Sequence, residues 1–236
     1  MARLCLCINQ VAQLRQLNRK REPDPVNVAM AAEIAGIDGI VVCWGPNRSD
    51  ISDRDLHVLK EVVKTHLNLA IPLEDEMVKK AIRTLPDMVT LLPAVEDESM
   101  SLDVDANLEY IEEVAATLRA NNIVVNALIA PENNQVRAAA RAGMDYVQIN
   151  TFPFSLVEDL GTMTEQVERI RSVALAAHKL GMGVSAGRGL SYQNIREIGG
   201  IDIIEECNVG RAIISRSLLV GIDRAVIHFK SQLIGK

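Results

Sequence analysis

Eight short apolar segments, each followed by a segment with helical spacing, constrain this sequence most. The apolar segments hold five to seven residues and are rich in β-branched side chains. They lack a strict polar alternation, which is typical of strands that are buried on both faces. The expected strands are residues 4–9, 39–43, 67–71, 88–92, 123–129, 146–150, 183–187 and 203–208.

Helical patterns fill the intervals between these strands. Asp24 is expected to cap a helix in which Pro25 takes the first position and Gly36 marks the end. Ser52 and Asp55 indicate the start of the next helix. The expected helices after the first are residues 52–64, 74–85, 105–122, 132–143, 164–181, 191–200 and 210–233.

The strict alternation of eight strands with helices predicts a (β/α)8 TIM barrel, an α/β fold. A doubly wound open sheet is the alternative, and the count of eight favours the barrel. The sequence contains no Pro- or Ser-rich linker and no shift in composition, so we expect residues 1–236 to form a single barrel domain. Apolar residues make up 48% of the chain, enough for a sizeable core.

Composition excludes several classes of partner. The net charge of −6 argues against a nucleic-acid partner, and the 3% of aromatic residues disfavours platforms for base stacking. No apolar run reaches the roughly 18–20 residues that would span a membrane. Residues 1–10 indicate a first strand rather than a signal peptide, and four cysteines suit a reducing, cytoplasmic compartment.

Two glycine turns follow the seventh and eighth strands, "AGRGL" at 186–190 and "NVGRA" at 208–212. In TIM barrels the active site lies at this end of the strands, and these two loops often bind phosphate through backbone N–H groups. Two arginines in the turns can add charge-assisted bonds, although turns with solvated arginines are the alternative. The predicted ligand or phosphate site comprises Asn9, Gln148, Asn150, Gly187, Arg188, Gly189, Gly210 and Arg211.

Candidate catalytic groups are few. The four histidines fall on expected helices or at a strand entrance, so no near-neutral acid or base lines the mouth. Cys43, which ends the second strand, and Glu74, which follows the third, are the candidates for catalytic residues. Cys43 has no evident basic partner in the sequence, so a packing role is its alternative.

Three further features remain open. Cys5 and Cys7 share a face of the first strand, and Cys43 and Cys207 lie on the strands expected to neighbour it, so a thiolate metal site is an alternative. Without a C-x-x-C motif or a nearby histidine we predict no metal site. The acidic segment 94–105 is interpreted as a solvated face, with a lid or a Mg²⁺ site as alternatives. The basic segment 18–22 is interpreted as a solvated turn, with a phosphate or oligomer contact as the alternative.

Several segments carry a resemblance to one family. The order "PDP", "DRD", "AGxGL" and "NxGxAII", with "AAARAGMDYVQINT" between the second and third, is similar to pyridoxine 5′-phosphate synthases over nearly the whole chain. The resemblance implies a TIM barrel with extra helices that forms homo-oligomers. It also implies condensation of 1-deoxyxylulose 5-phosphate with 3-amino-2-oxopropyl phosphate, with release of phosphate and without a metal or organic cofactor.

The sequence departs from that family where the acid–base groups are expected. The family pattern has histidine at the positions of Cys43, Asn150, Arg188 and Arg211, glutamate at Ala70 and Gln148, and arginine at Gly45. After Asn9 the chain is two residues short and loses an Asp-His pair, and the loop after the fourth strand is about three residues shorter. The glycines of the phosphate-binding turns are kept.

Retained phosphate-binding glycines together with exchanged acid–base residues are compatible with three functions. The first is a diverged enzyme that acts on another phosphorylated small molecule, because arginine suits phosphate or carboxylate. The second is a non-catalytic paralogue that acts as a ligand sensor or oligomer partner. The third is an authentic pyridoxine 5′-phosphate synthase. The exchange of several acid–base groups favours the first two on the sequence alone, since each such group typically contributes 10²–10⁴-fold to rate.

Overall fold

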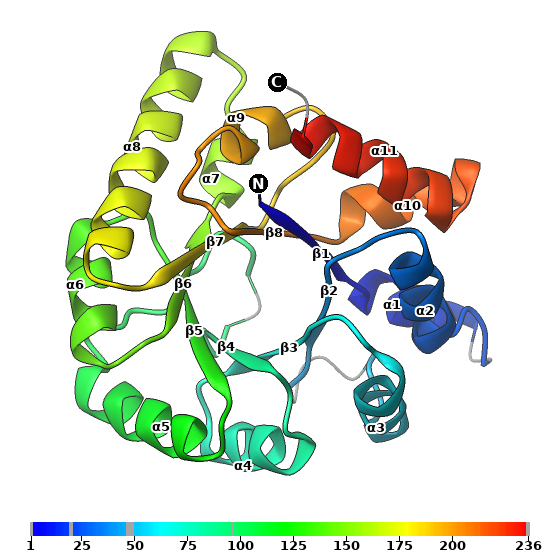
Figure 1. Cartoon of the computed structure of the whole chain (residues 1–236), viewed down its shortest axis with the longest axis horizontal. Coiled ribbons are helices and arrows are strands. Elements are labelled where there is room, and N and C mark those ends of the chain that lie inside the picture. Colours follow the sequence, from blue (N-terminus) through cyan, green and yellow to red (C-terminus); the bar gives the residue numbers. More distant parts are fainter. Residues whose placement is uncertain (1, 19–20, 46–49, 96, 235–236) are drawn as a thin grey trace.

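Eight parallel strands close into a barrel, in which each strand pairs with the next and β8 pairs with β1 (Figure 1). The computed structural model describes residues 2–18, 21–45, 50–95 and 97–234. Closure decides between the two expected folds, and it confirms the TIM barrel over the open sheet. The strands are β1 (Arg3–Cys7), β2 (Gly39–Cys43), β3 (Leu67–Pro72), β4 (Met88–Leu92), β5 (Val124–Ile129), β6 (Tyr146–Asn150), β7 (Gly183–Gly187) and β8 (Glu206–Val209).

Helices surround the barrel as an outer ring (Figure 1). Those of the first half are α1 (Asn9–Asn18), α2 (Pro25–Ile34), α3 (Asp53–Val62), α4 (Asp75–Thr84) and α5 (Leu108–Ala120). Those of the second half are α6 (Asn133–Arg141), α7 (Phe152–Ser155), α8 (Leu160–Lys179), α9 (Ile195–Gly199), α10 (Arg211–Val220) and α11 (Ile222–Ile234).

The expected helix signals at α2 and α3 are confirmed. The Asp24 carboxylate accepts a hydrogen bond from the backbone N–H of Val26, and Pro25 occupies the first helical position. Ser52 and Asp55 form a reciprocal capping box at the start of α3. Such caps satisfy N–H groups that have no partner inside the helix.

Several expected boundaries are wrong: α8 begins at Leu160 instead of residue 164 and α9 at Ile195 instead of residue 191, and three further differences concern the mouth or the last strand and helices. The first strand ends at Cys7, and Asn9 already begins α1 instead of ending the strand. The eighth strand starts at Glu206, because the preceding residues form a turn in which Ile204 N–H donates to the carbonyl of Ile201. The expected helix 210–233 is two helices, because Gly221 adopts a φ of 86° between them.

The core has two layers. A large apolar cluster fills the space between the barrel and the helices, and the outward-facing Leu4 and Leu6 of β1 belong to it. A smaller cluster inside the barrel closes it below the carboxyl ends of the strands, and Cys7 and Cys43 pack on this layer from above. Its members are Cys5, Val41, Ala70, Leu92 and Leu128. Among the described residues, no helix has the length and apolarity that a membrane crossing requires.

Candidate functional site

A cavity of about 420 Å³ opens at the carboxyl ends of the strands. Its floor comes from the inner apolar layer, and its walls come from α1 and from the turns after β7 and β8. Residues far apart in the sequence therefore meet there, as the barrel fold requires. The residues that line it include Cys7, Asn9, Cys43, Glu98, Gln148, Arg188, Gly189, Asn208, Gly210 and Arg211.

Arg188 follows β7 in a left-handed backbone conformation with a φ of 78°. This conformation is uncommon for a residue with a side chain, and it persists where the surroundings enforce it. Here the buried Thr151 holds the turn, since its hydroxyl donates to the carbonyl oxygens of Gly187 and Arg188 at 3.0 and 2.6 Å. The half-buried Arg188 side chain lines the cavity, and no carboxylate of the described residues pairs with it.

The N-terminus of α10 opens into the same cavity. Gly210 precedes the helix and offers no side-chain cap, so the first N–H groups lie at the mouth without a capping oxygen. Such N–H groups and the helix dipole favour an anion. A side chain at position 210 would crowd this turn, because a Cβ there would lie 2.6 Å from Oε1 of Gln10 and 3.0 Å from Cβ of Cys7.

Arg211, the first residue of α10, is not equivalent to Arg188. Its Nη2 lies 2.7 Å from Oε2 of Glu98, which belongs to the loop after β4. The acidic segment was expected to form a solvated face, and this ion pair was not predicted. Only the closed barrel brings the two residues together, since they are 113 positions apart.

Gly187 has a packing role that the sequence analysis did not predict. The Asn208 amide donates to Oε1 of Gln148 at 2.9 Å, and this bond crosses Gly187 on the strand between them. A Cβ at position 187 would lie 2.5 Å from Nε2 of Gln148. Glycine is therefore needed here for close packing of the two amides, and Gly187 itself does not line the cavity.

The side chain of Asn9 makes its hydrogen bonds with other residues of the protein. Its Oδ1 accepts from the backbone N–H of Cys43 at 2.8 Å, and its Nδ2 donates to the carbonyl of Cys43 at 2.6 Å and to Asp50 at 2.9 Å. The thiol of Cys7 also donates to Oδ1 at 3.6 Å. Asn9 is buried, so its predicted role as a ligand residue becomes one of fixing the ends of β1 and β2 at the mouth.

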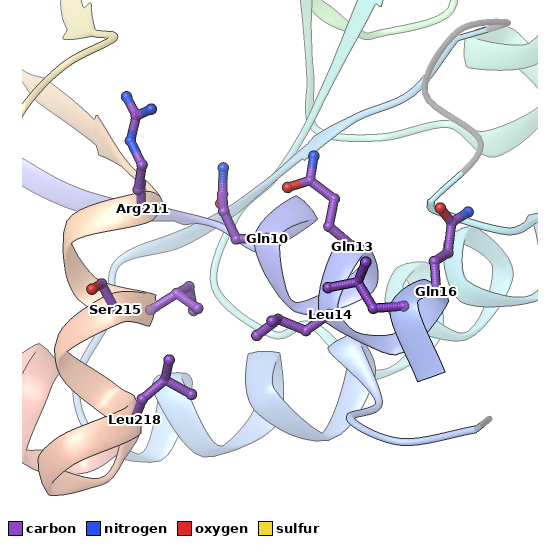
Figure 2. Close-up of a pocket in the computed structure, with 9 residues that line it drawn as sticks. Gln10, Gln13, Leu14, Gln16, Arg211, Ser215 and Leu218 are labelled. Carbon is purple, nitrogen blue, oxygen red and sulfur yellow. The ribbon is translucent and has the colours of Figure 1, made fainter. Parts of the chain in front are cut away.

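A larger hollow of about 590 Å³ lies beside the mouth, between α1 and α10 (Figure 2). Its lining consists mainly of glutamine and leucine side chains, and it shares Gln10, Gln13, Arg211 and Ser215 with the mouth. Figure 2 shows the side chains of Gln10 and Arg211 directed to the same side, away from Leu218 at the other end of the hollow. We place the candidate site at the mouth because the strand ends and both glycine turns converge there.

Comparison with known proteins supplies the family. The chain matches the family described as pyridoxal phosphate biosynthesis protein PdxJ over residues 4–235. The chain belongs to the PdxJ family. It is 43% identical to the pyridoxine 5′-phosphate synthase of Geotalea uraniireducens over 96% of both chains, and 38% identical to that of Prochlorococcus marinus over 99% of both. The resemblance that the sequence motifs carried is thereby confirmed.

Solved structures resemble the fold at low sequence identity. KGPDC from Streptococcus mutans superposes with a TM-score of 0.68 at 12% identity, over 99% of this chain and 98% of that one. Phosphoribosyl anthranilate isomerase from Thermus thermophilus gives 0.63 at 12% identity, over 98% of both. These likenesses support the barrel architecture that the PdxJ match implies, and nothing about its chemistry.

Not every predicted residue reaches the cavity of this PdxJ family member. Glu74 occupies the N-cap position of α4 without a side-chain capping bond and is not among the lining residues, so the structure does not bring it to Cys43. Asn150 is buried and its Nδ2 donates to the carbonyl oxygens of Glu98 and Met100, so it shapes the mouth indirectly.

Arg19 and Lys20 of the basic segment 18–22 lie outside the described residues. Within the described ranges, no three potential metal-ligating side chains cluster.

Proposed function

We propose that the barrel mouth binds a phosphorylated small molecule and that the chain is a synthase of the pyridoxine 5′-phosphate type. The observation that carries the binding proposal is Arg188, a cation that lines the cavity without a carboxylate partner among the described residues. A guanidinium that makes no ion pair keeps its donors available for an incoming anion. The open N-terminus of α10 adds backbone donors to the same space.

The relatives support the synthase over a non-catalytic paralogue. Identities of 43% and 41% to synthases of Geotalea uraniireducens and Pelobacter propionicus extend over 96% of each chain. On the sequence alone a diverged enzyme ranked first, and these identities reverse that order. The substrates to test are those that the family resemblance implies, 1-deoxyxylulose 5-phosphate and 3-amino-2-oxopropyl phosphate.

The side chains at the mouth favour a second candidate. Cys43, Ala70, Gln148, Arg188 and Arg211 stand where the family pattern has histidine or glutamate, and Glu98 is committed to Arg211. Proton transfers in the family's reaction need positioned acids and bases. The second candidate is therefore an enzyme that keeps the phosphate site and performs different chemistry on a related phosphorylated substrate.

One experiment separates these candidates. The purified chain is incubated with both substrates, and pyridoxine 5′-phosphate and released phosphate are quantified by chromatography, with the Geotalea uraniireducens synthase as a parallel control. Turnover within about 100-fold of the control supports the synthase. Background turnover, together with calorimetric binding of either substrate, supports the second candidate. If neither substrate nor inorganic phosphate at tens of millimolar binds, the proposed phosphate site is wrong.

A further inference from the structure

Two thiols meet at the mouth of the barrel. Cys7 ends β1 and Cys43 ends the neighbouring β2, with Cys7 in register with Val41. Both side chains are half-buried and line the same cavity at the ends of adjacent strands. The sequence offers no basic partner for Cys43, and the group beside it is the thiol of Cys7 on the adjacent strand.

Asn9 fixes the geometry of this pair. One carboxamide holds the backbone of Cys43 from both sides, through its N–H and its carbonyl, and also accepts from the thiol of Cys7. Asp50 in turn accepts from the same amide nitrogen at 2.9 Å. A buried amide with these partners has no freedom to rotate, so it holds the backbone of Cys43 and the thiol of Cys7 at the mouth without help from a ligand.

Access to the cavity distinguishes this pair from the other two cysteines, which do not line it. The hydrogen bond with Cys43 and burial hold the pKa of the Cys7 thiol well above its usual range, against the opposing charge of Arg188. The Cys7 thiol keeps its proton and donates a hydrogen bond to Oδ1 of Asn9 in this structure. Rotation about the Cβ–Sγ bond can turn that proton to the neighbouring sulfur, where a donated hydrogen bond stabilises a thiolate. Cys5 is fully buried beneath the cavity, whereas Cys207 is fully buried between the barrel and the helices. Burial raises the pKa of both thiols, that of Cys207 to about 12.

We propose that Cys43 and Cys7 form a nucleophilic thiol pair that captures the carbonyl carbon of a phosphorylated ketone or aldehyde. The proposal rests on the phosphate binding proposed above, since Arg188 lines the same cavity and anchors the anionic end of the ligand. A soft sulfur nucleophile beside an anion site suits a small phosphorylated molecule with an electrophilic carbon.

The capture step balances without an oxidant or another reactant. The Cys43 thiolate sulfur forms a bond to the carbonyl carbon, and the π-electron pair moves to the carbonyl oxygen. That oxygen takes the proton of Cys7, which leaves a thiohemiketal on Cys43 and a thiolate on Cys7. The reverse sequence releases the carbonyl compound. Cys43 is the catalytic residue in this scheme, Cys7 is its proton donor and Asn9 is a positioning residue.

The first test measures thiol reactivity without phosphate. Iodoacetamide labelling near pH 7.5, followed by peptide mass spectrometry, is expected to modify Cys43 at least about tenfold faster than Cys5 or Cys207. Cys7→Ala should slow the labelling of Cys43 severalfold, whereas Cys7→Ser keeps a donor and should restore much of the rate. Cys207→Ser is the matched control and should leave the rate unchanged. Equal labelling of all four cysteines overturns the proposal.

The second test adds the phosphate anchor. The probe is 1-bromo-3-hydroxyacetone phosphate, a haloketone from which the attacking sulfur displaces bromide. The expected result is saturable alkylation of Cys43, competed by inorganic phosphate and absent in Cys43→Ser. If the haloketone labels another residue, and that labelling saturates and is competed by phosphate, then the proposed role of Cys43 and Cys7 is wrong. The proposed phosphate site is supported by the same result. A third outcome is that iodoacetamide labels Cys43 quickly but the haloketone reaction does not saturate. This outcome means that the cavity does not bind the phosphate group of the probe, and it overturns the capture of phosphorylated carbonyls.

Discussion

Oε2 of Glu98 lies 2.7 Å from Nη2 of Arg211, across the mouth of the barrel. The loop that carries Glu98 is held by the buried Asn150, whose Nδ2 donates to three successive carbonyl oxygens, those of Glu98, Ser99 and Met100. The chain thus supplies its own anion to one of the two mouth arginines. An incoming phosphate must compete with this carboxylate for Arg211.

Glu98→Gln is therefore expected to tighten phosphate binding. Removing a competing charge from a partly exposed ion pair corresponds to roughly 0.5–1 kcal/mol, or about two- to fivefold in the dissociation constant. Isothermal titration with inorganic phosphate at low ionic strength measures it. Glu112→Gln, on the exposed face of α5, is the control and should bind like the unmodified chain. Weaker binding in Glu98→Gln would contradict this interpretation.

Arg188→Gly is expected to weaken anion binding without unfolding the barrel. The substitution removes the unpaired guanidinium, and hydrogen bonds to charged groups contribute about 1.5–3 kcal/mol, so affinity should fall by roughly tenfold or more. Glycine adopts a φ of 78° without penalty, so the midpoint of thermal unfolding should change little. Arg216→Met, at an exposed position of α10, should keep the affinity. Unaltered phosphate binding in Arg188→Gly would remove the basis of the proposed site.

Gly189→Ala should destabilise the turn after β7 through crowding. A Cβ at this position would lie 2.2 Å from Oγ and 2.6 Å from Cβ of Ser155, and the φ of 70° adds strain. Gly181→Ala is the matched control, because its φ of 84° is also positive but no atom lies within 4 Å of the added Cβ. Urea unfolding should show a loss for Gly189→Ala that exceeds that of the control by about 1–3 kcal/mol. Equal losses in the free energy of unfolding would mean that the positive φ alone destabilises both variants and that contact with Ser155 contributes nothing.

The acid stability of the chain should depend on Asp55. Burial would raise the pKa of this carboxyl, but hydrogen bonds from Arg15 and Ser52 outweigh burial and lower the pKa from 3.8 to about 2. Because the folded pKa lies below the unfolded one, the ionised carboxylate stabilises the fold by about 2 kcal/mol above pH 5. This contribution is lost as the pH falls from about 4 through 2.

Urea unfolding between pH 2.5 and 7 checks this dependence. Asp55→Asn should lower stability at neutral pH and should flatten the decline between pH 4 and 2, because the titrating group is gone. Asp105→Asn, at an exposed position, should retain the full decline. A decline of unchanged steepness in Asp55→Asn would assign the acid sensitivity to other carboxyls.

Much of the scaffold was predictable from sequence. The expected strands 39–43, 88–92, 146–150 and 183–187 coincide with β2, β4, β6 and β7, because strands buried on both faces are continuous apolar runs with turn residues at their ends. Helix α1 escaped prediction, since its residues 9–18 are largely polar and no capping residue precedes them. The glycine turns were recognised from their motifs and their place after the last two strands.

The sequence by itself determined the barrel, the family and the glycine turns at its mouth, because these depend on local patterns of apolar, turn and capping residues. The tertiary structure alone decided which side chains meet there. Cys7 and Cys43 were expected on neighbouring strands, and the pairing of β1 with β2 brings both to one cavity. Glu98 meets Arg211 across 113 residues through closure of the barrel. Strand register and closure of the barrel determine such contacts, and neither can be read from the linear pattern of residues.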